Sequence, residues 1–194
     1  MKACKKIFIL VGDPNTESLC SLLAREYESS ARSKGFEVRY THLADVSFDP
    51  ILHKGYRVVQ TLEPGLKKIQ EDMIWADHLV ICYPVWWAST PSLLKALFDR
   101  IWVPGFAFHF KKKGLGWLKY LSGRSCRIIQ TSGSSWWFIF TKFGNPSRIL
   151  RKAILEFAGI KPIKVSWFDS VNKASSDKIE RIKKAVRELG AGGL

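Results

Sequence analysis

The sequence predicts an α/β protein built on a doubly wound parallel β-sheet, with helices on both faces. Short apolar runs alternate along the chain with segments of helical periodicity, which is the order of repeated β-α-β units. The runs 6–11 and 79–83 are almost continuously apolar and rich in β-branched residues, as is typical of strands that are buried on both faces. Right-handed connections between such strands place helices on both faces of the sheet.

The first half of the chain contains three of the predicted strands. Gly12-Asp13-Pro14 ends the first apolar run, and Gly35 stops the helical pattern that follows it. The segment 45–62 shows neither the apolar spacing of a helix nor the alternation of a strand, and it is expected to be irregular. Pro91 suits the first turn of a helix. The expected elements are a strand at 6–11, helix at 19–31, strand at 36–40, helix at 66–76, strand at 79–83 and helix at 91–102.

The second half continues the alternation and completes a single domain over 1–194. No internal repeat or linker interrupts it, and its core is expected to span 6–189, with a frayed tail at 191–194. Either Ser175 or Ser176 suits the N-cap of the last helix. The expected elements are a strand at 127–130, helix at 149–157, strand at 164–168 and helix from the cap to Leu189.

The composition is that of a globular protein with an unusual charge. Apolar residues make up 46% of the chain, and no apolar run is long enough to span a bilayer. The apolar stretch 7–11 is too short for a signal peptide, so a cytoplasmic location is expected. The net charge is +14, from 31 basic and 17 acidic residues, which favours anionic ligands, acidic partners, nucleic acid or an anionic membrane surface. The basic residues are dispersed without a recognition motif, so nucleic acid is not expected.

Cysteine and histidine spacing gives no sign of a metal site. The four cysteines contain no C-x-x-C pair, which indicates reduced thiols with packing roles. The four histidines lack the spacing of a ligand set. No metal is therefore expected.

Three loops follow predicted strands at the edge where open α/β sheets bind ligands. The loop 12–18 offers hydroxyl and amide groups beside a helix N-terminus, which suits a phosphate, although an ordinary turn with a helix cap fits equally. The loop 84–89 carries two tryptophans that either flank a planar ring or pack in a core or dimer contact. The loop 131–134 contains Gly133, which admits a close ligand but is also common in plain turns. Together the three loops suit a phosphorylated planar cofactor.

Five motifs in this order resemble those of a known family. They are Gly12-Asp13-Pro14-x-x-x-Ser18, Tyr83-Pro84-Val85-Trp86-Trp87, Pro91-x-x-Leu94-Lys95-x-x-x-Asp99-Arg100, Pro104-Gly105-Phe106-Ala107-Phe108 and Thr131-Ser132-Gly133. They resemble the flavodoxin-like NAD(P)H:quinone oxidoreductase family, of the modulator-of-drug-activity and potassium-efflux ancillary type. The similarity covers about residues 6–189 and is most specific over 83–108.

The resemblance implies a five-stranded sheet of order 2-1-3-4-5 and a homodimer with its active site at the subunit boundary. It also implies FMN or FAD, held without a covalent bond. The first loop would hold the phosphate, the second would line the isoalloxazine and the third would approach its pyrimidine side. The residues carried over are Asp13, Asn15, Glu17, Ser18, Leu19, Pro84, Val85, Trp86, Trp87, Ala88, Thr131, Ser132, Gly133 and Ser134.

Two departures from the family pattern stand out. Asp13 occupies a position where the family usually has His, and a carboxylate beside a phosphate is unfavourable unless it turns away to cap the helix. The mammalian members of the family use a Tyr and a His near the substrate, but the matching stretch 135–144 contains no His. Charge on the reduced flavin would then be stabilised by backbone groups or solvent, or the substrate differs.

The resemblance further implies a two-electron reductase that passes hydride from NAD(P)H to a quinone-like acceptor by a ping-pong mechanism. Backbone donors near Gly133, Ser134 and Trp87 would assist, and no catalytic side chain is assigned. Candidates for the acceptor pocket are Trp87, Phe106, Phe108 and Trp136. The alternative is a regulatory flavoprotein subunit on a membrane transporter or another acidic partner. The aromatic and basic segment that begins at Trp136 also fits weak contact with a membrane surface.

Overall fold

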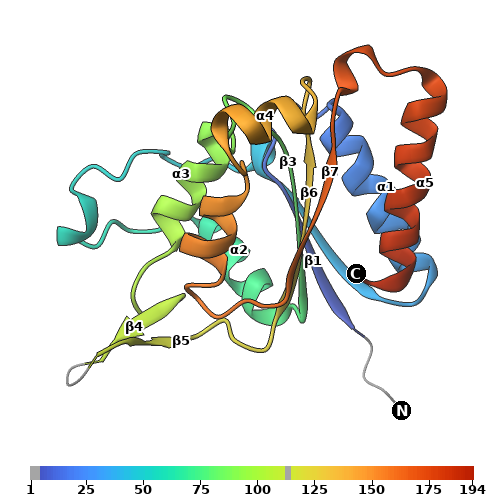
Figure 1. Cartoon of the computed structure of the whole chain (residues 1–194). Helices are drawn as coiled ribbons and strands as arrows, with labels where there is room; N and C mark the ends of the chain where they lie inside the picture. Colours follow the sequence, from blue (N-terminus) through green and yellow to red (C-terminus); the bar gives the residue numbers. More distant parts are fainter. Residues whose placement is uncertain (1–4, 112–114) are drawn as a thin grey trace.

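A computed structural model of the chain describes residues 5–111 and 115–194. Its main sheet has five parallel strands in the order β2-β1-β3-β6-β7, which confirms the predicted order 2-1-3-4-5 (Figure 1). β1 and β2 pair over their full length, from Lys6 opposite Glu37 to Val11 opposite His42. The strands are β1 (Lys6–Val11), β2 (Glu37–His42), β3 (His78–Pro84), β6 (Ser125–Thr131) and β7 (Ile163–Phe168).

Helices cover both faces of the sheet, as predicted (Figure 1). Alternate residues of β1 point to opposite faces: Ile7 and Ile9 join one buried cluster, whereas Phe8 and Leu10 join the other. This two-sided burial explains why β1 is continuously apolar. The first cluster packs under α1 (Leu19–Ser33) and α5 (Ser176–Gly192), and the second under α2 (Pro64–Trp75), α3 (Ser92–Ile101) and the π-helix Ile149–Leu155.

Side-chain caps fix the beginnings of two of these helices. The Ser18 hydroxyl accepts the Ser21 N–H of α1 at 3.2 Å, and the Ser175 hydroxyl accepts the Lys178 N–H of α5 at 3.3 Å. Ser175 is therefore the cap of the last helix, rather than Ser176. Pro91 is the residue before α3 rather than part of its first turn.

The sequence analysis missed a short hairpin and one helix. The hairpin pairs β4 (Phe108–Phe110) with β5 (Trp117–Lys119), and its strands are too short to show a period of two. The helix α4 (Trp136–Phe143) has apolar residues on all sides, so the contrast that reveals an amphipathic helix is absent.

The C-terminal tail is a correction to the sequence analysis. We expected residues 191–194 to be frayed, but α5 continues to Gly192 and Gly193 closes it with φ of 60°. The Leu194 N–H donates to the Leu189 carbonyl at 3.0 Å. Glycine takes this left-handed conformation without the steric cost of a Cβ, so the tail forms a helix cap.

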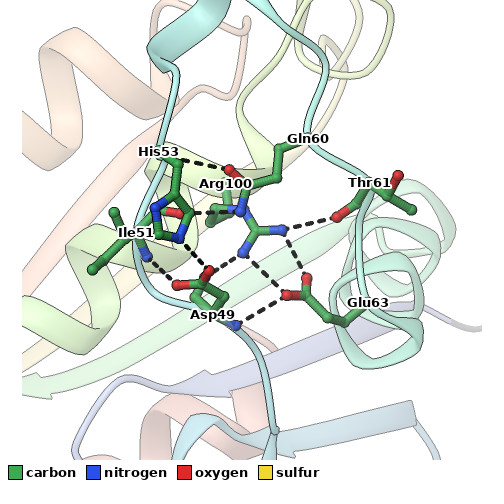
Figure 2. A network of polar contacts seen from close by, with 7 residues as sticks. All are labelled: Asp49, Ile51, His53, Gln60, Thr61, Glu63 and Arg100. Carbon is green, nitrogen blue, oxygen red and sulfur yellow. Dashed lines mark hydrogen bonds and ion pairs between the residues drawn. The ribbon is translucent and has the colours of Figure 1, made fainter.

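The irregular segment 45–62 is held to the domain by Arg100 of α3, whose side chain is fully buried (Figure 2). Its guanidinium donates to the backbone carbonyls of Asp49 and Thr61 and to both carboxylate oxygens of Glu63. The Glu63 carboxylate also accepts the Asp49 N–H at 3.0 Å. The two ends of the segment are thus joined at one buried cation.

His78 at the start of β3 makes the stability of the fold dependent on pH. Burial, together with the charges of Lys5 and Arg127, lowers the pKa of His78 to about 3. Unfolded His78 would bind a proton below about pH 6.5, whereas folded His78 stays neutral, so stability falls as pH decreases. We expect the free energy of unfolding to drop by about 2 kcal/mol from pH 7 to pH 5 through this group. Urea titrations check this, and His78→Gln should flatten the slope; an unchanged slope in that variant would contradict it.

Two further features agree with the composition. None of the helices in the part of the chain that the structure describes has the length and apolarity needed to cross a bilayer. Cys20, Cys82 and Cys126 are free, buried thiols, and burial raises the pKa of Cys82 and Cys126. They are therefore packing residues rather than nucleophiles.

Candidate functional site

The three loops highlighted by the sequence meet at the carboxyl edge of the sheet. The Val85 N–H donates to the Thr131 carbonyl at 2.7 Å, which joins the second loop to the third. The first turn of α1 reaches the same place, because the Cys20 thiol lies 3.2 Å from the Thr131 hydroxyl. Gly12 and Cys82 close the arrangement through a backbone hydrogen bond of 2.8 Å.

Asp13 in the first loop is buried and hydrogen-bonded within the loop. Only 3% of this residue is exposed, and its carboxylate accepts the Asn15 N–H at 2.9 Å. The Asn15 side chain in turn accepts the Glu17 N–H at 3.0 Å. The carboxylate therefore has a structural role in two successive turns of the loop.

Several N–H groups of the first loop remain available to a ligand. Those of Thr16, Leu19 and Cys20 meet no acceptor among the described residues, whereas Ser18 caps the Ser21 N–H. Unpaired donors at the N-terminus of a helix attract anions, and the helix dipole adds to this preference. The loop therefore has the donors that a phosphate needs. Of the five expected residues, Asp13, Asn15, Glu17 and Ser18 lie in the loop and Leu19 begins α1.

A buried histidine supports this loop, and the sequence analysis did not find it. The Nδ1 atom of His42 accepts the Ala44 N–H at 3.2 Å, so Nε2 carries the proton and donates to the Ser21 hydroxyl at 2.8 Å. The Ser21 hydroxyl in turn donates a hydrogen bond to the Asn15 carbonyl at 3.1 Å. The chain of bonds positions the loop from β2, and burial lowers the pKa of His42. Neutral His42 is the form that this network requires.

The second loop contains a strained turn at the two tryptophans. Trp86 and Ser89 exchange backbone hydrogen bonds of 3.0 and 2.9 Å, and the two residues between them have positive φ, 50° for Trp87 and 55° for Ala88. Trp87 is fully exposed, and neither its N–H nor that of Ala88 meets an acceptor among the described residues. Strain of this kind concentrates at functional sites. The turn presents an indole and two backbone donors to the same edge.

The strain at Ala88 can be measured. Glycine adopts positive φ without the steric cost that Ala88 incurs, so Ala88→Gly should stabilise the fold by about 1 kcal/mol. Ala185→Gly, within α5, is the matched control and should destabilise by a similar amount. Urea unfolding of the two variants gives the comparison. Destabilisation by both would show that Ala88 carries no strain.

The third loop is held by hydrogen bonds, and the Ser132 side chain within it is used to stabilise the fold. The Ser132 hydroxyl accepts the Trp167 indole N–H at 2.8 Å and donates to the Ser134 carbonyl at 2.8 Å. The Thr131 hydroxyl contacts Cys20, as described above. This leaves Gly133 and Ser134 as the exposed part of the loop, and the third loop would meet a ligand through its backbone.

A cavity of about 310 Å³ joins the second and third loops. Gly133 borders this cavity, and its φ is one that any residue can adopt. Glycine is needed here because of the limited space: an added Cβ would lie 2.4 Å from the Asn172 side chain. A flat ligand can therefore approach the backbone closely here. The cavity is lined by Pro84, Val85, Trp86, Trp87, Thr131, Ser132, Gly133, Val171 and Asn172.

Residues in and just after β7 complete the site, and no local sequence pattern points to them. The Asp169 carboxylate accepts the Trp136 N–H at 2.6 Å and so caps α4, and Val171 donates to the Ser132 carbonyl at 3.0 Å. Asn172 and Trp167 belong to the same wall. Their roles depend on β7 lying beside β6, which only the folded sheet shows.

The four candidates for the acceptor pocket are divided between two ends of the molecule. Trp87 lines the cavity, and Trp136 begins α4 above it. Phe106 is instead buried against Trp102, and Phe108 packs edge-on against Phe157 beside the β4–β5 hairpin. Figure 1 shows this hairpin at the opposite end of the sheet from α4. Within one protomer, Phe106 and Phe108 are therefore not at the site.

A second groove, of about 410 Å³, adjoins the tryptophan turn. Trp86 and Trp87 form one side, and Pro146, Ile149 and Leu150 form the other. A third hollow, of about 370 Å³, lies beside the first loop, between Arg25, Tyr40 and His42. A further cavity, of about 600 Å³, lies between the segment 45–62 and α2 and is lined by none of the candidate site residues.

No metal site accompanies these cavities. Across residues 5–111 and 115–194, no three His, Cys, Asp or Glu side chains gather in a way that would hold a metal ion. The site therefore offers backbone donors, hydroxyls and aromatic rings. Such a set fits an anionic and planar organic group.

Comparison with known proteins places the chain in a family. The sequence profile of the family described as having a flavodoxin-like fold matches residues 5–191. The chain belongs to this flavodoxin-like family. The family assignment agrees with the sheet order and with the loops at its carboxyl edge.

Individual relatives of this flavodoxin-like chain are distant but cover much of it. A protein from Haemophilus influenzae named uncharacterized NAD(P)H oxidoreductase is 25% identical, over 94% of this chain and 91% of its own length. An FMN-dependent NADH:quinone oxidoreductase from Lachnoclostridium phytofermentans is 28% identical, over 59% of this chain and 56% of that protein. The crystal structure of Smu.1420 from Streptococcus mutans superposes with a TM-score of 0.82 and 28% identity, covering 96% and 99% of the two chains.

Proposed function

We propose that this protein is a flavin-dependent NAD(P)H oxidoreductase that reduces a quinone-like acceptor by two electrons. The observation that carries the proposal is the meeting of three loops at one edge: one with unpaired N–H donors, one with a strained tryptophan turn and one with an open glycine. The names of the relatives from Haemophilus influenzae and Lachnoclostridium phytofermentans support the same class of reaction.

Each loop would have a separate task towards non-covalently bound FMN. The N–H groups of Thr16, Leu19 and Cys20 would bind the phosphate. The backbone at Trp87 and Gly133 would lie against the isoalloxazine, with N–H donors directed at the atoms that gain negative charge. When bound, the flavin supplies hydride acceptance and donation. No side chain at the site is needed as a proton donor under this proposal.

FAD is the second candidate cofactor. The hollow of about 370 Å³ beside the first loop, lined in part by Arg25 and Tyr40, is next to the proposed phosphate position. An adenosine extending from the phosphate would have space there. The guanidinium of Arg25 already stacks on Tyr40 at 3.6 Å, so it offers a flat cationic surface.

The test is the identity of the bound chromophore followed by kinetics. Purified protein should be yellow, and mass spectrometry of the released chromophore separates FMN from FAD. Because donor and acceptor would use the cavity in turn, initial rates against both substrates should give parallel lines. Colourless protein that binds neither flavin at saturating concentration would overturn the proposal, and intersecting lines would overturn the ping-pong order.

A homodimer in the cytoplasm is part of the same proposal. Phe106 and Phe108 lie far from Trp87 within one protomer, so these rings would reach an acceptor pocket only in the partner subunit. Sedimentation equilibrium measures the assembly, and fractionation of cells measures the location. A protein that remains monomeric yet turns over quinone at full rate would exclude Phe106 and Phe108 from the pocket.

The second candidate function is a regulatory flavoprotein subunit that sits on an acidic partner. The net charge of +14 favours it. Steady-state turnover separates the two, because a regulator would bind flavin but oxidise NAD(P)H slowly. Rapid turnover with a quinone acceptor would favour the reductase.

A further inference from the structure

The helix α4 exposes an unusual amount of aromatic surface. We call its five exposed aromatic residues the α4 surface: Trp136, Trp137, Phe138, Phe140 and Phe143, with exposed fractions of 54, 62, 45, 50 and 67%. Ile139 is the one residue of α4 that is buried. A group of large apolar side chains in water marks an interaction site rather than ordinary surface.

The α4 surface is held in a fixed orientation. Trp136, Phe140 and Phe143 are spaced by four and then three residues, so they share one side of the helix. The Asp169 carboxylate and the Ser135 hydroxyl accept N–H groups at the start of α4, and Ile139 anchors it to the core. The aromatic rings are therefore presented outward by a rigid element.

Apart from Asp169, which caps α4 and lies 3.9 Å from the Lys178 ammonium, the charges near the α4 surface are positive. The sequence contains no Asp or Glu between Asp99 and Glu156, although this stretch includes α4. Lys142, Arg148 and Arg151 lie in or just after the helix, and none of them forms an ion pair with another described residue. Unpaired cations beside exposed aromatic rings are suited to an anionic partner.

The α4 surface lies close to the candidate site. The groove of about 410 Å³ runs between the tryptophan turn and the segment after α4, where Ile149 is 60% exposed. In Figure 1, α4 lies across the carboxyl end of the sheet, where the three loops meet. A partner that covers α4 would therefore also border the groove.

We propose that the α4 surface docks on an anionic phospholipid membrane. Tryptophan and phenylalanine insert at the level of the lipid headgroups, while lysine and arginine bind the anionic phosphates. A second copy that packs α4 against α4 is a poorer occupant, because this symmetric contact would bring Lys142, Arg148 and Arg151 near the same cations of the other chain. The inference goes beyond the proposed reaction and does not depend on flavin binding. Docking would place the groove where lipid-soluble acceptors are dissolved.

The experiment is co-sedimentation of the full chain with phosphatidylcholine vesicles, with and without phosphatidylserine, at low and at high salt. Binding should require phosphatidylserine and weaken as salt screens the charges. The double variant Lys142→Gln/Arg148→Gln should weaken vesicle binding about 25-fold, because each cation near the membrane surface contributes a factor of about five. Trp137→Ser/Phe143→Ser should weaken it at least about tenfold through lost insertion.

The matched control removes the same charge elsewhere. Lys34→Gln/Lys184→Gln changes two exposed lysines of the α1 and α5 layer that form no ion pair with the described residues, and should alter binding less than about twofold. Far-UV circular dichroism and thermal unfolding show that each variant is folded. Equal loss in this control, equal binding to neutral vesicles or no binding would overturn the proposal. The proposal would also be overturned if the protein bound no vesicles and formed a dimer that the double variant Trp137→Ser/Phe143→Ser converts to monomers. That result would assign the α4 surface to a second copy.

Discussion

Gly133→Val is expected to yield a folded protein that binds flavin at least about 100-fold more weakly, equivalent to roughly 3 kcal/mol of binding free energy. The backbone at Gly133 has an ordinary φ, so valine is not excluded by conformation. Its side chain would displace the end of the Asn172 side chain and fill part of the cavity of about 310 Å³. Fluorescence titration with FMN and FAD measures the loss, and thermal unfolding of the apoprotein measures the fold.

Gly65→Val is the matched control for this change. A Cβ at Gly65 would also crowd a single movable side chain, that of Val46, at 2.6 Å, but the residue lies outside the three loops. Both variants should therefore lose similar stability, and only Gly133→Val should lose flavin. If Gly133→Val binds flavin normally, the third loop does not approach the cofactor and the proposed pose is wrong.

Arg100→Met is expected to destabilise the fold by about 3 kcal/mol, because it removes one partner of a buried ion pair. The side chain has no exposed surface, whereas that of Glu63 is 29% exposed and can recover some hydration. The carbonyls of Asp49 and Thr61 would also lose their donor (Figure 2). Urea unfolding measures the loss. Amide hydrogen exchange should show faster opening of the segment 45–62 than of β1.

Lys95→Met is the control for Arg100→Met. It breaks an ion pair with Asp99 of similar length, 2.7 Å, on the exposed side of the same helix. Exposed pairs contribute little, so the change should stay within about 0.5 kcal/mol. A loss below about 1 kcal/mol in Arg100→Met would mean that the segment 45–62 is held by its apolar contacts instead.

Local sequence patterns found the sheet and most of its helices. Continuous apolar runs predicted β1 and β3, because a strand covered on both faces needs apolar residues at every position. The patterns failed at α4 and at the β4–β5 hairpin. The helix α4 lacks a polar side, and the strands β4 and β5 are too short to show an alternation of apolar and polar residues. The local signal is therefore absent in both cases.

The sequence by itself determined the fold class and the three loops that carry the candidate site, because each depends on residues adjacent in the chain. The strand order was expected only from the family resemblance. Only the tertiary structure decided which distant residues complete that site. Trp167, Asp169 and Asn172 reach the third loop because β7 pairs with β6, and His42 reaches the first loop because β2 pairs with β1. Packing likewise separated Phe106 from Trp87, since contacts between remote segments follow from the folded sheet and leave no periodic trace in the sequence.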